Sequence, residues 1–479
     1  MIYLILIIST LYFIIHLFDE DPKSTSKYFG DDSKEIEIPK KGLENKKIAV
    51  IGGGISGLSS AKYLLEANAN VTLLEKEDRV GGNNDPYLEN GKHYATTVIV
   101  TYPCQQPHYL NLCRELGINQ IPHDFEELEG EIILKENKKL KVRMGSGFWT
   151  FFKYIYKQCS TKELIDGIHI MLLFYKQFKL RPESKKSIKD VLGKRLVKSS
   201  AFTHVFMPWI GINTWCRFDD IDSQPAHIFG AFIYEYALTL SIRKKDYLPK
   251  ENGWCVLDGR IIHELEKKLK NNKNYIQRKK FNVTNITRQN NKIIVMSDEN
   301  EKLEFDKIIV ATQPFQALPI IKEVGNKKVI QELEKWPKMD CYVILHKDLS
   351  QIKDMPWVHQ THINQKNKNY YITNTIKPRM SKIKYDCAIT FVYNKINYKD
   401  FIDNHIDVKK IIKTYTPKLP IFTLENSINR NEIWDIIDND CHDVYWTQAC
   451  KSGIQYHNNA ILNSKKIVKI MAEKELSLT

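Results

Sequence analysis

The stretch that decides the fold is KKIAVIGGGISGLSSAKYLLEANANVTLLEKEDRVGG, residues 46–82. Its apolar residues 48–51 predict a short buried strand, and residues 71–74 predict a second strand. Between them a helix is expected, because apolar residues recur there at helical spacing. This order predicts a βαβ unit at the start of a parallel sheet.

Three glycines join the first strand to the helix with the spacing G-x-G-x-x-G. Gly52 allows a tight turn, Gly54 lets a diphosphate approach the backbone, and Gly57 permits close packing of helix and strand. The first helical turn, which contains Ile55 and Ser56, presents unpaired N–H groups to an anion. The spacing therefore predicts a dinucleotide site.

An acidic residue follows the second strand, as a dinucleotide site requires. Glu75 lies 18 residues beyond Gly57 and is placed to accept hydrogen bonds from a ribose. Strand, glycines, helix, second strand and acid all occur in order. We therefore interpret residues 46–82 as a nucleotide cradle.

The residues after this acid distinguish FAD from NAD. The run Glu75 to Gly82 has the pattern E-x-x-x-R-x-G-G, which resembles the second glycine motif of the FAD-binding amine oxidase and phytoene desaturase superfamily. The resemblance implies that Arg79, Gly81 and Gly82 lie along the FAD diphosphate, and Lys76 is counted with them. An ordinary turn after a strand is the alternative interpretation.

The loop after Gly82 and the helix that ends in E-L-G-I, at residues 115–118, resemble one branch of this superfamily in particular, the predicted NAD/FAD-binding flavin amine oxidoreductases. Two later segments resemble the superfamily as a whole. A strand over residues 275–283 ends in N-V-T, and the resemblance implies that the backbone of Val283 holds the adenine. Residues 306–312, DKIIVAT, resemble the family's D-x-V-V-x-A-T strand, which runs beneath the FAD and ends at Thr312.

The last segment of the chain resembles the closing flavin motif of this branch, with Gly453 and His457 on the matching positions. The resemblance implies that a helix N-terminus faces the pyrimidine edge of the flavin, and His457 is the candidate catalytic residue near the reacting ring. The chain departs from the motif, because Gln448 and Ala449 stand where a glycine is usual and Lys465 replaces a small residue. Loss of the glycine would crowd the ribityl chain.

The loop after the cradle also departs from the branch. A glycine is usual there, and this chain has Thr96 and Thr97 instead. A helix is then predicted over residues 109–116, with Gly117 as its C-cap.

Residues 1–18, MIYLILIISTLYFIIHLF, predict an uncleaved transmembrane anchor. At 1.5 Å per residue a helix of this length spans about 27 Å, close to the thickness of a thin bilayer. A cleaved signal peptide is the alternative, but the run lacks a basic amino end and a small-residue cleavage site. Lysines after the run favour a single-pass protein with its body in the cytoplasm. Residues 19–45 are interpreted as a flexible linker.

Charge and cysteine content exclude some other classes. The formal net charge is +14, but the lysines are spread along the chain instead of clustered, so no nucleic-acid partner is expected. The nine cysteines are scattered and include no C-x-x-C pair, which indicates reduced thiols. No metal-ligand spacing is present, and no metal is predicted.

The predicted fold class is α/β. It comprises a Rossmann-like FAD/NAD(P)-binding domain with a parallel sheet and a small β-meander, and a substrate domain of helices and mixed, largely antiparallel sheet. The meander strands are expected over residues 292–297 and 303–305. The FAD-binding domain is expected to be discontinuous (residues 46–120, 251–320 and 436–479), with the substrate domain between its parts (residues 121–250 and 321–435).

Three functions remain open on this scaffold. The first is an FAD-dependent amine-type oxidoreductase that removes a hydride from a C–N or C–C bond. The second is a flavin enzyme that desaturates an acyl or isoprenoid lipid, which the anchor and the apolar middle of the chain would suit. The third is a non-enzymatic carrier of prenylated proteins. Trp215 and Trp254 are candidate walls of the pocket for a small-molecule or lipid substrate.

Overall fold

The structure is a computed structural model of the 479-residue chain. It describes residues 36–97, 100–101, 106–118, 121–122, 128–133, 139–144, 157–180, 184–214, 216, 218–230, 255–256, 259–350, 358–366, 369–377, 387–392, 402, 406–427, 430–452 and 455–478. The predicted anchor, Trp215, Trp254 and Gly453 lie outside these residues, so what was predicted of them stays a prediction. Within the described ranges, no helix combines the length and apolarity that crossing a bilayer requires.

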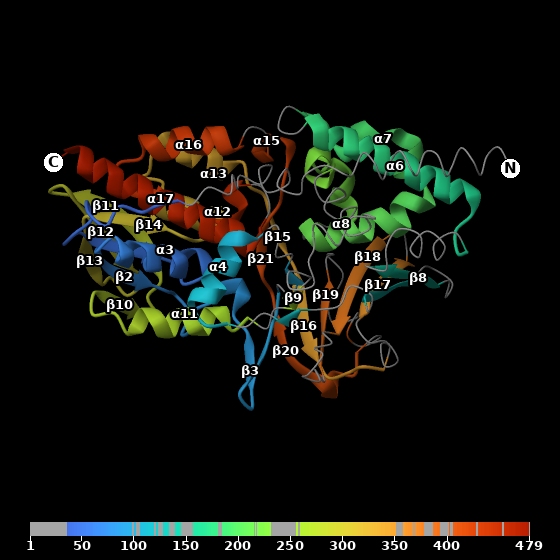
Figure 1. Ribbon diagram of the computed structural model, residues 1–479, viewed down its shortest axis with the longest axis horizontal. Coiled ribbons are helices and arrows are strands. Elements are labelled where there is room, and N and C mark those ends of the chain that lie inside the picture. The colour runs from blue at the N-terminus through green and yellow to red at the C-terminus, as the bar shows by residue number, and fades with distance from the viewer. Residues whose placement is uncertain are drawn as a thin grey trace.

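A five-stranded parallel sheet forms the centre of one half of the molecule (Figure 1). Its strand order is β10-β2-β1-β14-β22, and every neighbouring pair is parallel. The strands are short and apolar because both faces of the sheet are covered. This confirms the predicted parallel sheet. The bounds are β1 (Lys47–Ile51), β2 (Asn70–Leu74), β10 (Tyr275–Arg278), β14 (Lys307–Val310) and β22 (Val444–Trp446).

Two helices from opposite ends of the chain pack against each other beside this sheet. The predicted glycine-motif helix is α3 (Ile55–Glu66), and the predicted last helix is α17 (His457–Leu478). The hydroxyl of Ser464 in α17 lies 2.9 Å from the carbonyl oxygen of Ser56 in α3. Further helices of this half are α4 (Pro107–Glu115), α11 (Ile261–Lys270), α12 (Pro314–Ile321), α13 (Lys327–Glu334), α15 (Leu424–Ser427) and α16 (Arg430–Asp440).

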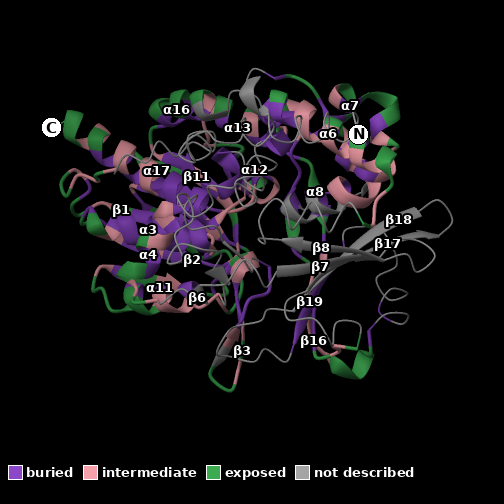
Figure 2. Ribbon diagram, turned by 45° about the vertical axis from the view of Figure 1, so that its right-hand side comes forward, coloured by how far each residue is buried: buried purple, intermediate pink, exposed green. Residues whose placement is uncertain are grey.

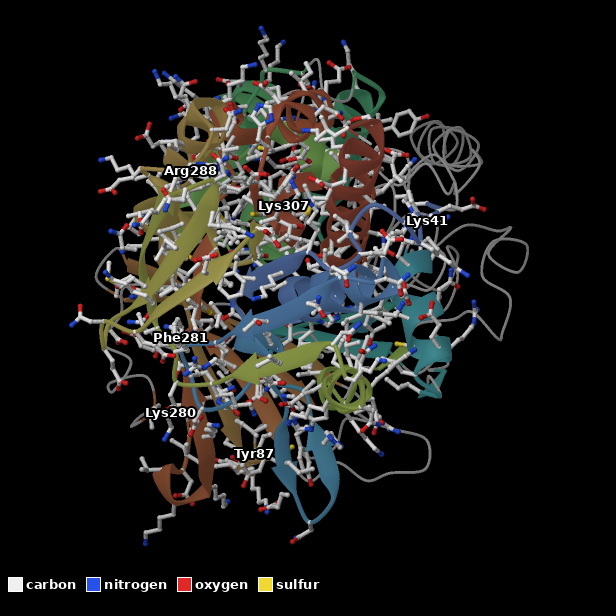
Figure 3. All side chains as sticks on the ribbon, turned by 90° about the vertical axis from the view of Figure 1, so that its left-hand side faces the viewer. Lys41, Tyr87, Lys280, Phe281, Arg288 and Lys307 are labelled. Atoms are coloured by element: carbon white, nitrogen blue, oxygen red, sulfur yellow. The ribbon has the colours of Figure 1, made fainter. Side chains whose placement is uncertain are left out.

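The carboxyl end of α17 is also held against the sheet. The ammonium group of Lys307, at the start of β14, lies 2.7 Å from Glu475 near the end of α17 and 2.9 Å from Asp443 just before β22 (Figure 3). These contacts join the amino ends of two sheet strands to the helix. Together with the Ser464 contact they hold α17 along the length of the sheet domain.

The prediction of one strand over residues 275–283 is wrong. The chain forms β10 in the parallel sheet, turns, and then forms β11 (Val283–Gln289) in the meander. Lys280 in the turn has a φ of +57°, which no strand residue adopts (Figure 3). The meander therefore has three antiparallel strands, because β11 joins the predicted pair β12 (Lys292–Ser297) and β13 (Lys302–Phe305).

The other half contains a seven-stranded sheet and a group of helices (Figure 1). The sheet order is β20-β16-β19-β18-β17-β7-β8, antiparallel throughout except for the pair β17 and β7, which makes it a mixed sheet. The bounds are β7 (Leu128–Ile133), β8 (Lys139–Met144), β16 (Tyr342–His346), β17 (Val358–Lys366), β18 (Asn369–Lys377), β19 (Ala388–Val392), β20 (Ile411–Tyr415), α6 (Thr161–Leu180), α7 (Ile188–Val197) and α8 (Met207–Thr214).

Smaller sheets connect these parts. The hairpin of β3 (Tyr87–Glu89) and β4 (Lys92–Tyr94) projects from the body in Figures 1 and 2. The remaining short strands are β5 (Val100–Thr101), β6 (Ile121–Pro122), β9 (Cys255–Val256), β15 (Lys338–Asp340) and β21 (Lys418–Pro420). Buried residues are densest around α3, α17 and the parallel sheet (Figure 2). The domain boundaries drawn from the sequence stay a prediction.

Candidate functional site

The carboxyl end of β1 forms an open cradle. Gly52 has a φ of +101°, and a Cβ on it would lie 2.8 Å from Thr312 Cγ2, so only glycine fits the turn. A Cβ on Gly57 would lie 1.8 Å from the carbonyl oxygen of Gly52, which explains the close packing of α3 on the strand. A Cβ on Gly54, by contrast, would have no heavy atom within 4 Å. The three glycines therefore have the separate structural roles that their spacing predicts.

The start of α3 faces this opening. Its N-cap is Gly54, and no acidic residue lies in its first turn. The first N–H groups of a helix have no partner four residues earlier, and they favour a negative charge. The cradle therefore offers open space, backbone donors and a positive helix end in one place.

The second glycine motif lies directly against the first. The N–H of Gly81 donates to the carbonyl oxygen of Gly53 at 2.8 Å, and Gly81 and Gly54 form an isolated parallel bridge. Gly81 has a φ of +116°, and Gly82 is exposed with a φ of +55°. Arg79 precedes Gly81 by two residues, so the bridge also places its backbone beside the start of α3.

Glu75 closes the cradle from the end of β2. Its buried carboxylate accepts hydrogen bonds from the N–H of Gly53 at 2.6 Å and from the N–H of Glu77 at 2.9 Å. A carboxylate offers about four acceptor positions, so these two bonds leave room for a ribose. Lys76 is exposed, and its ammonium group lies 3.3 Å from the Glu77 carboxylate.

Val283 and Thr312 also lie beside the cradle. The N–H of Phe281 donates to the carbonyl oxygen of Glu75 at 2.9 Å, which places the start of β11 next to the end of β2 (Figure 3). Thr312 follows β14, the sheet neighbour of β1, and its methyl group faces Gly52. Segments far apart in the sequence thus converge on one edge of the sheet.

His457 begins α17. It lies seven residues before Ser464, which contacts α3, and this corresponds to about 10 Å along the helix. Its ring stacks on Tyr109 with 5.1 Å between the centroids, and neither ring nitrogen has a hydrogen-bond partner in the described part of the structure. Burial lowers the pKa of His457 to about 4, so the imidazole is neutral at neutral pH.

The neighbouring Asn458 joins α17 to α4. Its side-chain oxygen accepts hydrogen bonds from the N–H groups of His108 at 2.8 Å and Tyr109 at 3.3 Å, in the first turn of α4. These bonds fix the starts of two helices side by side. The start of α17, which carries His457, is therefore held against α4, and the role of His457 in chemistry stays a prediction.

The departures from the closing motif are accommodated by local hydrogen bonds. The Gln448 side chain donates to the carbonyl oxygen of Ala311 at 3.0 Å and accepts from the N–H of Ala449 at 3.1 Å. Asn463 of α17 donates to the Gln448 carbonyl oxygen at 2.8 Å. The ammonium group of Lys465 lies 5.8 Å from the centre of the Tyr63 ring, on α3.

Several buried polar groups without a partner lie at this edge of the sheet, and others lie elsewhere in the described part of the chain. Among the buried side-chain atoms that the structure describes, the hydroxyls of Ser56, Thr312 and Thr447 and both nitrogens of His457 have no hydrogen-bond partner. Such groups are rare in folded proteins and indicate a ligand or water. With the open position at Gly54, they fit a bound dinucleotide.

Asp85, Thr96 and Thr97 were not predicted as site residues. Thr96 donates to the carbonyl oxygen of Asp85 at 2.9 Å, and Thr97 donates to that of Asn83 at 2.5 Å. The two threonines thus fasten their loop to the turn after the second glycine motif. The only signal in the sequence was the glycine missing from that loop.

Comparison with known proteins identifies the family. The model of the family described as "Flavin containing amine oxidoreductase" matches residues 55–340. The chain belongs to this family. Membership confirms the superfamily resemblance and a flavin as the class of cofactor.

Curated relatives match over short stretches. The chain is 38% identical over 81 residues to 15-cis-phytoene desaturase of Narcissus pseudonarcissus, covering 17% of this chain and 14% of the relative. It is 45% identical over 73 residues to flavin-containing amine oxidase A of Equus caballus, covering 15% and 14%. It is 43% identical over 144 residues to L-amino-acid oxidase of Pseudechis australis, covering 29% and 24%. The chain thus matches less than two thirds of the length of each relative.

Solved structures match nearly the whole chain. A triple mutant of putrescine oxidase gives a TM-score of 0.64 at 12% identity, covering 91% of this chain and 99% of the other. The CLA-producing fatty acid isomerase from P. acnes gives 0.60 at 16% identity, covering 90% and 99%. At these identities the likeness establishes the fold alone, which confirms the predicted α/β class.

Proposed function

We propose that this protein is an FAD-dependent oxidoreductase that removes a hydride from a C–N or C–C bond of a small-molecule or lipid substrate. The observation that carries the proposal is the cradle at Gly54, where open space, the uncapped start of α3 and the second glycine motif meet. Family membership supports a flavin in that cradle. FAD supplies the hydride acceptor, and the chain supplies position and a water-poor surrounding.

The residues that would hold the FAD have distinct tasks. The backbone N–H groups of Ile55 and Ser56 and the guanidinium of Arg79 would bind the diphosphate. Glu75 would accept hydrogen bonds from the ribose. The backbone of Val283 would contact the adenine. Further residues proposed to line the cofactor are Gly52, Gly54, Gly57, Lys76, Gly81, Gly82, Thr312, Gly453 and His457.

A neutral His457 suits a hydride-transfer site. With one ring nitrogen protonated and the other free, it can donate one hydrogen bond and accept another without adding a charge. The start of α17 adds a positive helix end, and no acid lies in its first turn. We propose that this helix end would stabilise negative charge on a flavin bound beside it.

The visible spectrum of the purified full-length protein tests the proposal. Bands at about 370 and 450 nm, or their appearance on incubation with FAD, are expected of a flavoprotein. A colourless protein that FAD cannot reconstitute would exclude both enzyme functions and leave the carrier of prenylated proteins. The open, uncapped cradle weighs against that carrier.

A lipid desaturase is the second candidate. Both an amine oxidase and a phytoene desaturase are among the relatives of similar identity, so the comparisons do not favour one substrate class. Anaerobic bleaching of the bound flavin distinguishes the two. Bleaching by a polyamine supports amine oxidation, and bleaching by a lipid extract supports desaturation.

A further inference from the structure

Four side chains form a network behind the second glycine motif. The buried carboxylate of Asp85 accepts a hydrogen bond from Arg79 Nη1. On its other side, Nε2 of His263 lies 3.7 Å from Asp85 Oδ1. Nδ1 of His263 lies 2.9 Å from Nε2 of His93. The network thus joins the turn after β2 to α11 and β4.

The chemistry of the carboxylate orients this network. A carboxylate beside a ring nitrogen favours an N–H there over a lone pair, which favours the tautomer of His263 with its proton on Nε2. In that tautomer Nδ1 of His263 is the acceptor, and Nε2 of His93 donates to it. At 3.7 Å the contact between His263 and Asp85 is electrostatic, not a hydrogen bond. The Nε2–H of His263 then faces the carboxylate that holds Arg79.

The Asp85 carboxylate is less exposed than the groups on either side of it, and the His263 side chain is 30% exposed. The Arg79 side chain is 40% exposed and the Asp85 side chain 9%. A guanidinium has five N–H donors, and Asp85 uses one of them, so the others remain available to an anion at the cradle. The bridge between Gly81 and Gly54 keeps the turn that carries Arg79 beside the start of α3.

Asp85 is held from several directions. A Cβ on Gly81 would lie 2.8 Å from its Cα, so the glycine permits the close approach. Thr96 binds its carbonyl oxygen. Burial first and the Asp85 charge second raise the pKa of the Tyr415 phenol on β20, so this phenol stays neutral and adds no charge near Asp85. Contacts from the turn that carries Arg79, from the Thr96 loop and from α11 therefore surround Asp85.

We propose that Asp85 is a positioning residue that orients Arg79 toward the diphosphate of the bound cofactor, and that His263 and His93 hold Asp85 in place. The inference rests on the proposed function, because it takes a diphosphate at the cradle as given. A free arginine has many rotamers and loses that freedom on binding, whereas an oriented guanidinium loses less.

The test uses His263, because its replacement leaves both Arg79 and the Asp85 carboxylate in place. Replacing Asp85 would also remove a negative charge near an anionic ligand, and the two effects would oppose each other. We expect H263L to weaken FAD binding about tenfold, the order of the cost of immobilising one flexible side chain on binding. H263Q, which keeps an N–H donor near the Nε2 position, should bind FAD within about twofold of the wild type.

A double-mutant cycle shows whether His263 acts through Arg79. In an R79M background, H263L should cause no further loss of FAD affinity. The FAD dissociation constant is measured on ligand-free protein by quenching of FAD fluorescence, with the thermal unfolding midpoint as the folding control. If H263L does not fold, H93L enters the same network from the other side.

Two results would overturn the inference. Equal FAD affinity of H263L and the wild type would show that the network does not orient Arg79. Equal losses with and without Arg79 would show that His263 acts by another route. Failure of the wild type to bind FAD would instead refute the proposed function itself.

Discussion

Alanine substitutions at Gly54 and Gly57 should separate cofactor binding from folding. At Gly54 the new methyl group would enter space with no heavy atom within 4 Å, and the backbone there (φ −73°, ψ −179°) suits any residue. At Gly57 the same methyl group would lie 1.8 Å from the carbonyl oxygen of Gly52. One change therefore blocks the cradle, and the other forces helix and strand apart.

The two substitutions should change the free energy of unfolding in opposite directions. Replacing glycine by alanine at a compatible position stabilises a protein by about 0.4–1 kcal/mol, because the unfolded chain loses freedom. Ligand-free Gly54→Ala should therefore unfold at or slightly above the wild-type temperature. Gly57→Ala must displace the strand–helix junction, and overpacking of this kind costs about 1–3 kcal/mol.

Thermal unfolding with and without FAD provides the assay. At a concentration of about 100 times its dissociation constant, a ligand stabilises the folded state by about 2.7 kcal/mol. The wild type should gain this increment, and Gly54→Ala should lose most of it, because the methyl group lies where the diphosphate must approach. Full FAD stabilisation of Gly54→Ala would refute the position of the diphosphate. An unchanged unfolding temperature of Gly57→Ala would refute the packing argument.

Two further predictions concern buried side chains that can carry a charge. The pKa of His457 is lowered from 6.5 to about 4 in the folded protein, so on acidification the unfolded chain binds a proton at this residue before the folded protein does. The free energy of unfolding is therefore highest above pH 6.5 and falls as the pH drops toward 4. His457→Phe keeps a ring against Tyr109 but cannot take up a proton, so this variant should lose about 3 kcal/mol less stability in acid than the wild type. Identical acid unfolding curves of the two proteins would contradict this. Lys451 Nζ lies 2.5 and 2.6 Å from the oxygens of buried Asp438, so Lys451→Met should destabilise the fold by about 3–5 kcal/mol. Adding Asp438→Asn to Lys451→Met should restore most of the lost unfolding temperature. If it does not, the destabilisation by Lys451→Met has a cause other than the unpaired Asp438 charge.

The sequence predicted the features that short-range spacing controls. The glycine spacing predicted the turn at Gly52, the open position at Gly54 and the packing at Gly57, because each depends on a few consecutive residues. Apolar runs and helical periodicity predicted the parallel strands and α17, because burial on both faces requires such runs. The acid at Glu75 followed from its distance to the glycines.

Contacts between distant segments were not predictable in the same way. The break at Lys280 divides residues 275–283 between two sheets, and nothing in their alternation marks where one sheet ends. The pairing of β17 with β7 joins residues more than 200 positions apart. The network around Asp85 combines residues from three elements whose proximity only the tertiary structure provides.

The altered closing motif is compatible with a cofactor for a structural reason. A side chain in place of glycine would obstruct a ligand most if it were free to turn into the site. Gln448 is not free, because both ends of its amide bind the backbone of Ala311 and Ala449, and Asn463 holds its carbonyl group. Its side chain instead joins the loop after β22 to the end of β14. The substitution thus exchanges the flexibility of a glycine for a fixed cross-strand contact, and it leaves the open position at Gly54 unchanged.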